Sequence, residues 1–102
     1  MGMLMRNEYY QRRYSIPGNL QPGMVDIRHL RLLMVLCSIS NPRMVLELEE
    51  VLVNGLSRRE ACERNGVSQS HLSVKYRRLQ DVNQIVLRIY PYVQDELECS
   101  SG

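Results

Sequence analysis

The chain contains no tryptophan and no phenylalanine, so its six aromatic residues are all tyrosines. A core must therefore be built from Leu, Val, Ile, Met and a few Tyr, a composition that suits helices packed on helices. With 102 residues, we expect one domain. A domain of this size encloses a modest core but not a deep cavity for a large cofactor.

Signatures of enzymes and metal sites are also missing. Three cysteines, Cys37, Cys62 and Cys99, have no metal-ligand spacing, and there is no glycine-rich phosphate loop. His29 and His71 are the only histidines, and neither has a neighbouring carboxylate and nucleophile. We therefore predict that the chain is not an enzyme and holds no metal and no cofactor. Cys37 and Cys62 are expected to be small core side chains.

The chain also lacks a long apolar run. The longest, residues 32–37, is too short to span a bilayer, and the first 15 residues lack the apolar stretch of a signal peptide. An odd cysteine count without a disulfide framework fits a reducing compartment. We expect a cytoplasmic protein with no membrane partner and no evident small-molecule ligand.

Charge is concentrated rather than abundant. The net charge is +2, but "SRREACERNGVSQSHLSVKYRRL", residues 57–79, has six basic and two acidic side chains, a local net of +4. The remainder of the chain is consequently −2. A basic patch in a near-neutral chain is typical of a small nucleic-acid binder, although an ordinary charged helix surface has the same composition.

Hydrophobic periodicity predicts an all-α fold, a small bundle of four to five helices. The expected helices cover residues 25–38, 42–54, 57–65 and 68–90, with Pro91 ending the last, and a break near residues 81–83 is an alternative. Asn41, Ser57 and Ser68 are the predicted N-caps. In the second helix, Glu47, Glu49 and Glu50 are expected to face water.

The predicted domain organisation has three parts. Residues 1–23 hold two Pro-Gly turn signals and no clean periodicity, so we expect a flexible arm. Within it, Arg12 and Arg13 could touch a phosphate backbone, or the arm could lie over the domain. Residues 24–93 form the helical domain, and residues 94–102 an acidic, flexible tail.

Residues 57–80 match the pattern of a helix-turn-helix. Ala61 and Cys62 are small residues at the helix contact, Gly66 suits a left-handed turn, and Val67 follows it to plug the core. After the cap at Ser68, Leu72, Tyr76 and Leu79 recur at helical spacing and are predicted to face inward.

The opposite face is then predicted to meet DNA. Its N-terminal residues would enter a groove, hydroxyl and amide groups could bond base edges, and arginines could reach a guanine or a phosphate. The predicted DNA-binding residues are Arg58, Arg59, Ser68, Gln69, Ser70, His71, Ser73, Val74, Lys75, Arg77 and Arg78.

Residues 32–37 and residues 82–89 are each apolar on more than one face. A chain this short has difficulty burying both segments alone. This predicts a dimer or larger homo-oligomer. The residues assigned to that interface are Leu33, Val35, Leu36, Ile85, Val86, Leu87 and Ile89.

The combination of motifs resembles the PapB-type regulators of fimbrial (adhesin) operons in enteric bacteria. The similarity spans residues 24–96 and includes a G-x-S-R-x-E-x-C-E segment beginning at Gly55, a helix rich in Ser and Arg, and Pro91-Tyr92 before acidic residues. The pair His71-Leu72 departs from the aromatic residues that are typical of the family in that part of the helix.

The resemblance implies a transcriptional regulator that binds AT-rich, repeated sites on double-stranded DNA as an oligomer. It would activate at low occupancy and repress its own operon at high occupancy, acting at the bacterial nucleoid. By the same match Arg58 is a DNA-binding residue, whereas Cys62 retains its packing role. Arginine-rich surfaces on AT-rich DNA are compatible with the minor groove, while a helix-turn-helix favours the major groove.

A second function remains open from the sequence. The same fold could be a protein-interaction module that acts on another regulator or on a polymerase subunit. That alternative requires the helices but not the exposed arginines.

Overall fold

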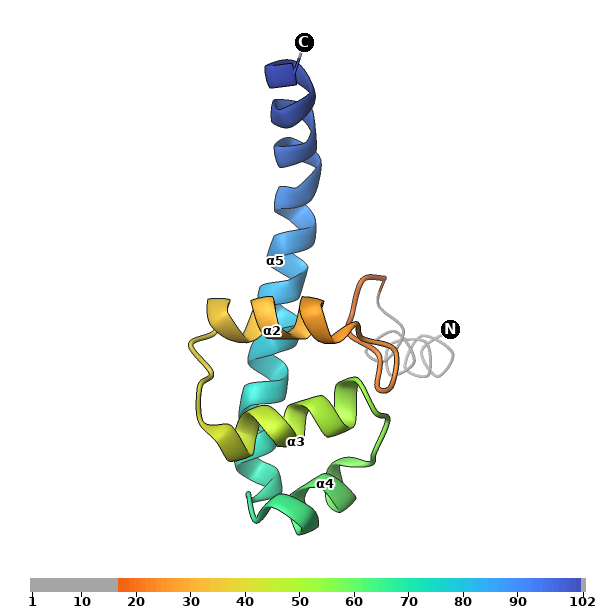
Figure 1. Cartoon of the computed structure of the whole chain (residues 1–102), viewed down its shortest axis with the longest axis vertical. Helices are drawn as coiled ribbons and strands as arrows, with labels where there is room; N and C mark the ends of the chain where they lie inside the picture. The colour runs from red at the N-terminus through yellow and green to blue at the C-terminus, as the bar shows by residue number, and fades with distance from the viewer. Residues whose placement is uncertain (1–16, 102) are drawn as a thin grey trace, which may run out of the picture.

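The computed structural model describes residues 17–101, and this part of the chain is all-α. It contains α2 (Ile27–Leu36), α3 (Pro42–Leu52), α4 (Arg58–Asn65) and α5 (Gln69–Ser101). In Figure 1, α2 and α3 cross α5, α4 lies at the base, and the C-terminal half of α5 projects beyond the bundle. The prediction of a small all-α bundle is thus confirmed.

Each of the first three helices begins at a side-chain cap that satisfies free backbone N–H groups. The Asp26 carboxylate accepts from the Arg28 N–H at 2.8 Å and also binds the Arg28 guanidinium at 2.7 Å. These bonds hold the pKa of Asp26 well below its usual range. The Asn41 side chain accepts from the N–H groups of Arg43 and Met44, and Ser57 accepts from that of Glu60.

The core lies where all four helices meet. Leu30 and Leu33 of α2, Met44 and Leu48 of α3, and Leu79 of α5 are almost completely buried. Because α4 is only eight residues long, it contributes just two small buried side chains, Ala61 and Cys62. The burial of both residues was predicted, but the sequence placed them at the contact with α5, whereas Cys62 bonds to Glu47 of α3.

The segment before α2 is part of the bundle. Leu20 is buried, and the N–H groups of Gly23 and Val25 donate to the carbonyls of Val51 and Leu52 at the end of α3. The lack of periodicity predicts a flexible arm over residues 1–23, but tertiary hydrogen bonds hold its described part, residues 17–23, against the bundle. Arg12 and Arg13 lie outside the described residues.

The last helix is longer than the sequence suggested. We expected Pro91 to end it, but α5 continues through Pro91 to Ser101, and it has no break near residues 81–83. Proline removes one N–H donor and usually kinks or ends a helix. The expected end at Tyr90 is therefore wrong, and residues 94–101, which were expected to form a flexible acidic tail, continue the helix. Asn83 is the last buried residue of α5, so the proline lies in its exposed half.

Candidate nucleic-acid interface

The turn between α4 and α5 is set by Gly66 and Ser68. Gly66 has φ 73° and ψ 20°, a left-handed conformation that costs a residue with a Cβ atom about 1–2 kcal/mol. Two residues later, the Ser68 hydroxyl accepts from the His71 N–H at 3.2 Å, and α5 begins. The predicted roles of both residues in the turn are confirmed, and together they fix the direction of α5.

The inner face of α5 holds it against the bundle. Leu72, Tyr76 and Leu79 are buried, as their spacing predicted, while Val67 beneath the turn is half-buried against the core. The opposite side of the first three turns of α5 therefore faces solvent.

The residues predicted to bind DNA lie on α4, the turn and this outer side of α5. All are exposed except Lys75, which is half-buried. Ser68 is also occupied as the cap of α5, and its hydroxyl lies 3.3 Å from that of Ser70. Arg58, Ser73, Val74 and Arg77 line one hollow, whereas His71 and Lys75 line another, so the predicted residues spread around the exposed part of the α4–α5 pair.

The arginines on this side differ in their surroundings. Arg59 forms an exposed ion pair with Glu63 at 3.3 Å. The Arg58 guanidinium instead lies over the Tyr76 ring, 4.0 Å from its centroid. This is a cation–π contact, in which the face of the ring attracts the positive charge. Among the described residues, Arg77 and Arg78 have no ion pair with a carboxylate within 4.0 Å. Their charges are available to an anionic partner.

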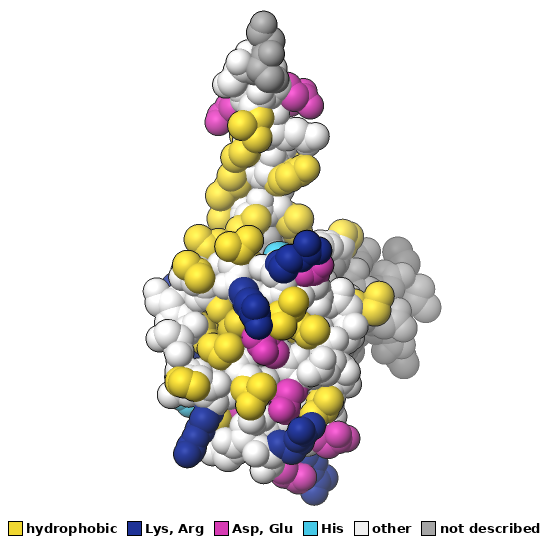
Figure 2. Space-filling view, viewed as in Figure 1, with side chains coloured by type: hydrophobic (Ala, Val, Ile, Leu, Met, Phe, Trp, Pro, Cys, Tyr) yellow, Lys and Arg dark blue, Asp and Glu magenta, His cyan; other side chains and the backbone are white. Residues whose placement is uncertain are grey.

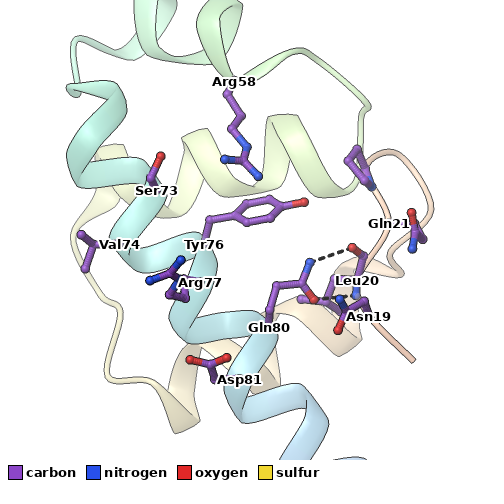
Figure 3. A pocket seen from close by; sticks show the side chains of 11 residues that line it. Asn19, Leu20, Gln21, Arg58, Ser73, Val74, Tyr76, Arg77, Gln80 and Asp81 are labelled. Atoms are coloured by element: carbon purple, nitrogen blue, oxygen red, sulfur yellow. Dashed lines mark hydrogen bonds between the residues drawn. The ribbon is translucent and has the colours of Figure 1, made fainter. Parts of the chain in front are cut away.

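A broad hollow opens beside these arginines. It has a volume of about 1060 Å³, and its walls are residues 19–22, Arg58 of α4 and the side of α5 from Ser73 to Asp81. Figure 3 shows Arg58 above the Tyr76 ring, with Arg77 next to it on α5. We call this hollow the arginine groove. A smaller hollow of about 230 Å³, lined by residues 38–41, Met44, His71 and Lys75, lies on the other side of α5.

Sequence reasoning missed the contribution of residues 19–22 to this site. Gln80 holds them: its side chain accepts from the Leu20 N–H and donates to the Leu20 carbonyl, both at 2.8 Å. These residues are 60 positions apart, so no local pattern could reveal the contact. The Pro17-Gly18 and Pro22-Gly23 pairs around the segment were a signal only for turns.

Behind the interface, α3 and α4 are joined by buried polar contacts. The Cys62 thiol donates to Glu47 Oε1 at 2.7 Å, and the Asn65 amide donates to Glu50 Oε2 at 3.0 Å. Glu47 and Glu50 are buried, so the expectation that they face water is wrong, while Glu49 is half-buried. Desolvation, followed by the hydrogen bond to Glu47, raises the pKa of Cys62 to about 11. This thiol is a structural group.

The surface also carries exposed apolar side chains. On α2, Leu32, Val35 and Leu36 recur at spacings of three and one and are exposed. On the projecting half of α5, the exposed large apolar residues are Ile85, Leu87, Ile89, Tyr90, Tyr92, Val93 and Leu97. In Figure 2, yellow side chains line the projecting helix and continue onto the body of the protein.

Of the residues predicted for an oligomer interface, Leu33 is wrongly assigned. Leu33 is 2% exposed and belongs to the core of the single chain, because α2 turns this side toward α3 and α5. Val86 is half-buried against the same core. The remaining predicted residues, Val35, Leu36, Ile85, Leu87 and Ile89, are exposed.

Other kinds of site have little support in the described part of the chain. No group of three or more His, Cys, Asp or Glu side chains is arranged to hold a metal ion within residues 17–101. Over the same residues, no helix has both the length and the apolar character to cross a membrane. Burial raises the pKa of Cys37, as it does that of Cys62.

The fold and site define a class: a small helical protein in which a short helix, a tight turn and a long helix present an exposed basic surface. The chain belongs to the adhesin biosynthesis transcription regulatory protein family, whose model, PapB, matches residues 4–93. The match begins well before residue 24, where we expected the similarity to start. The family is one of transcription regulators and not of enzymes. The prediction that the chain is not an enzyme is therefore confirmed.

Individual relatives agree with the family. The chain is 41% identical over 71 residues to the regulatory protein FanB of Escherichia coli, covering 70% of this chain and 69% of FanB. It is 35% identical over 77 residues to the major pilus subunit operon regulatory protein PapB of E. coli, covering 76% and 74% of the two chains. The crystal structure of E. coli FocB is similar with a TM-score of 0.69 and 28% identity, covering 82% of this chain and 92% of that one.

Proposed function

We propose that this transcription regulator binds double-stranded DNA through α4, the turn at Gly66 and the first turns of α5, acting as a helix-turn-helix. One observation carries the proposal. Arg58 of α4 and Arg77 and Arg78 of α5 are exposed, and none of the three has an ion pair with a carboxylate within 4.0 Å among the described residues. Exposed guanidinium groups without a carboxylate partner attract a phosphate backbone and can bond guanine edges.

The proposed contacts divide by chemistry. Gln69, Ser70, His71 and Ser73 have polar groups that can bond base edges, and the exposed Val74 can contact a thymine methyl group. The remaining proposed contacts position the protein on phosphates: Arg58, Arg59, Ser68, Lys75, Arg77 and Arg78. Arg59 contributes less than Arg58, because Glu63 already neutralises part of its charge.

The proposed target is AT-rich repeated sequence near an adhesin operon, bound by an oligomer. The names of relatives support the operon class, since they are regulatory proteins of pilus or adhesin operons. Exposed apolar residues on α2 and α5 support the oligomer, because contiguous apolar surface marks protein contacts. Activation at low occupancy and autorepression at high occupancy, at the nucleoid in the cytoplasm, complete the proposal.

Charge reversal tests the DNA contact. The triple variant Arg58→Glu, Arg77→Glu, Arg78→Glu should abolish binding to a duplex of AT-rich repeats. Arg88→Glu, an exposed charge on the projecting half of α5, is the matched control and should bind nearly as the wild type does. If the triple variant retains wild-type affinity, the DNA function is overturned and the protein-interaction module becomes the better explanation.

Salt and occupancy provide the second test. In wild-type protein, log Kobs should fall by about 0.9 per neutralised phosphate for each unit of log salt concentration, and the triple variant should lose most of this slope. Footprinting upstream of the chain's own gene should then show stepwise protection of AT-rich repeats as protein concentration rises. A single short footprint at all concentrations contradicts the assembly part of the proposal.

A further inference from the structure

The arginine groove has a wall that the helix-turn-helix alone does not supply. One side is formed by Arg58 of α4 and by Ser73 and Arg77 of α5, which are among the proposed DNA contacts. The other side is formed by residues 19–22, far away in the sequence (Figure 3). The groove is therefore continuous with the proposed DNA surface and extends it toward the N-terminal segment.

The far wall is held firmly by amide side chains of α5. Gln80 makes two hydrogen bonds with the backbone of Leu20, and the Leu20 side chain is buried in the core. One turn further on, Asn83 donates to the Gly18 carbonyl at 2.6 Å, and Gln84 donates to Asn19 Oδ1 at 2.7 Å. Because α5 itself fixes this segment, the wall keeps its place relative to the proposed recognition residues.

The charges of the groove select an anionic, extended occupant. Two guanidinium groups, Arg58 and Arg77, stand against one carboxylate, Asp81, which lies at the end of the lining stretch of α5. Arg58 is directed by its contact with the Tyr76 ring. A sugar–phosphate strand fits this arrangement, with phosphates near the arginines and away from Asp81.

We infer that residues 19–22 form a second wall of the DNA-binding surface, and that the arginine groove seats the sugar–phosphate backbone beside the site faced by α5. This inference rests on the proposed DNA-binding function. It places Gln21, which is exposed on the wall, close to the sugar–phosphate backbone of the DNA. It also makes Gln80 a positioning residue that acts through its hydrogen bonds to Leu20.

A charge placed on the wall tests the inference. Gln21→Lys should tighten binding to a duplex of AT-rich repeats by about fivefold at 0.15 M salt. The number of neutralised phosphates, obtained from the slope of log Kobs against log salt concentration, should rise by about one. Gln21→Glu should weaken binding by a similar factor. Gln94→Lys and Gln94→Glu make the same charge changes at an exposed position on the projecting half of α5 and should leave both quantities nearly unchanged.

The role of Gln80 is tested by coupling. In a Gln80→Ala background, the gain from Gln21→Lys should disappear, because the wall is no longer held beside the groove. Circular dichroism and urea denaturation of each variant establish that the bundle remains folded. If Gln21→Lys gains the same affinity with and without Gln80, the positioning role is wrong.

The outcomes separate this inference from the function on which it rests. If the wild type binds DNA and the Gln21 variants behave as the Gln94 variants do, the groove is not part of the interface and the inference fails alone. If the wild type does not bind the duplex, both fail. A shift confined to the Gln21 variants supports the second wall.

Discussion

Cys62 of α4 donates its thiol proton to Glu47 of α3 across 2.7 Å, and both side chains are buried. Glu47 Oε2 has no hydrogen-bond partner in the described part of the chain. Among the described residues, the Cys62 thiol is thus the one side chain that donates a hydrogen bond to the buried Glu47 carboxyl group. It joins α3 to the helix that carries Arg58, so the contact helps to position the proposed DNA surface.

Removing the thiol should therefore destabilise the fold by more than its small volume suggests. Cys62→Ala leaves both oxygens of Glu47 without a side-chain donor, and we expect a loss of about 1–3 kcal/mol in the free energy of unfolding. Cys62→Ser retains a donor and should lose less. Urea denaturation at neutral pH measures both, and equal losses contradict a role for the hydrogen bond.

Stability should also fall in alkaline solution through Cys62. Its pKa is raised from 9.0 in an unfolded chain to about 11 in the fold, so the folded protein holds this proton more tightly. The corresponding stability is complete below pH 9 and is lost as the pH rises to about 11. Unfolding free energies of wild type and Cys62→Ser, compared across this range, isolate the effect from the titration of tyrosines and lysines. Parallel pH profiles contradict the prediction.

Gly66 should be needed for its backbone conformation alone. A Cβ at this position meets no atom within 4 Å, so the cost of Gly66→Ala is that of φ 73°. We expect a loss of about 1–2 kcal/mol in thermal or urea unfolding. Gly66→Asn, which tolerates the left-handed region better, should lose less. An alanine variant as stable as the wild type would mean that the turn has another geometry.

Arg58 and Arg59 provide a matched pair for the stacking contact. Arg58→Lys keeps the charge but loses the planar group over Tyr76, and we expect DNA affinity to fall about twofold to fivefold with little change in the salt slope. Arg59→Lys, next to Glu63 and without a ring contact, should have a smaller effect. Fluorescence anisotropy with one labelled duplex measures both variants, and the reverse order of effects contradicts the assigned role of Tyr76.

The exposed apolar residues of α5 should control self-association. Ile89→Glu places a charge where a second copy of the chain is proposed to pack, so the apparent mass in sedimentation should shift toward the monomer. Folding should be unaffected, because Ile89 is half exposed and lies beyond the bundle. Gln94→Glu is the control. A wild type that is already monomeric at tens of micromolar, alone and on DNA, contradicts the prediction.

Elements determined by local chemistry were predictable from the sequence. Asn41 and Pro42 at the start of α3, Ser57 before α4, and the Gly66 turn each satisfy backbone groups within a few residues. Leu72, Tyr76 and Leu79 were equally clear, because their spacing alone defines the inner face of α5. The same residues determine which side of α5 is exposed.

Features that depend on distant partners were missed. Glu47 lies three residues after Met44 and one before Leu48, which places it on the buried stripe, but its charge suggested a solvent position. The thiol of Cys62, supplied by another helix, gives this buried carboxyl group a hydrogen-bond donor that its own helix does not reveal. Residues 17–23 present the same difficulty, since the amide groups that hold them come from positions 80–84.

The unbroken α5 fixes the angle around its axis between the basic side and the exposed apolar side. One helix carries both Arg77 and Ile89, about 18 Å apart along its axis at 1.5 Å per residue. A single residue inserted between them would turn the apolar side by about 100° relative to the basic side, whereas seven would nearly restore the angle and add about 10 Å. In the proposed oligomer, the angle between neighbouring copies and their DNA sites is therefore set by the number of residues in one helix, and the insertion or deletion of one codon alters it.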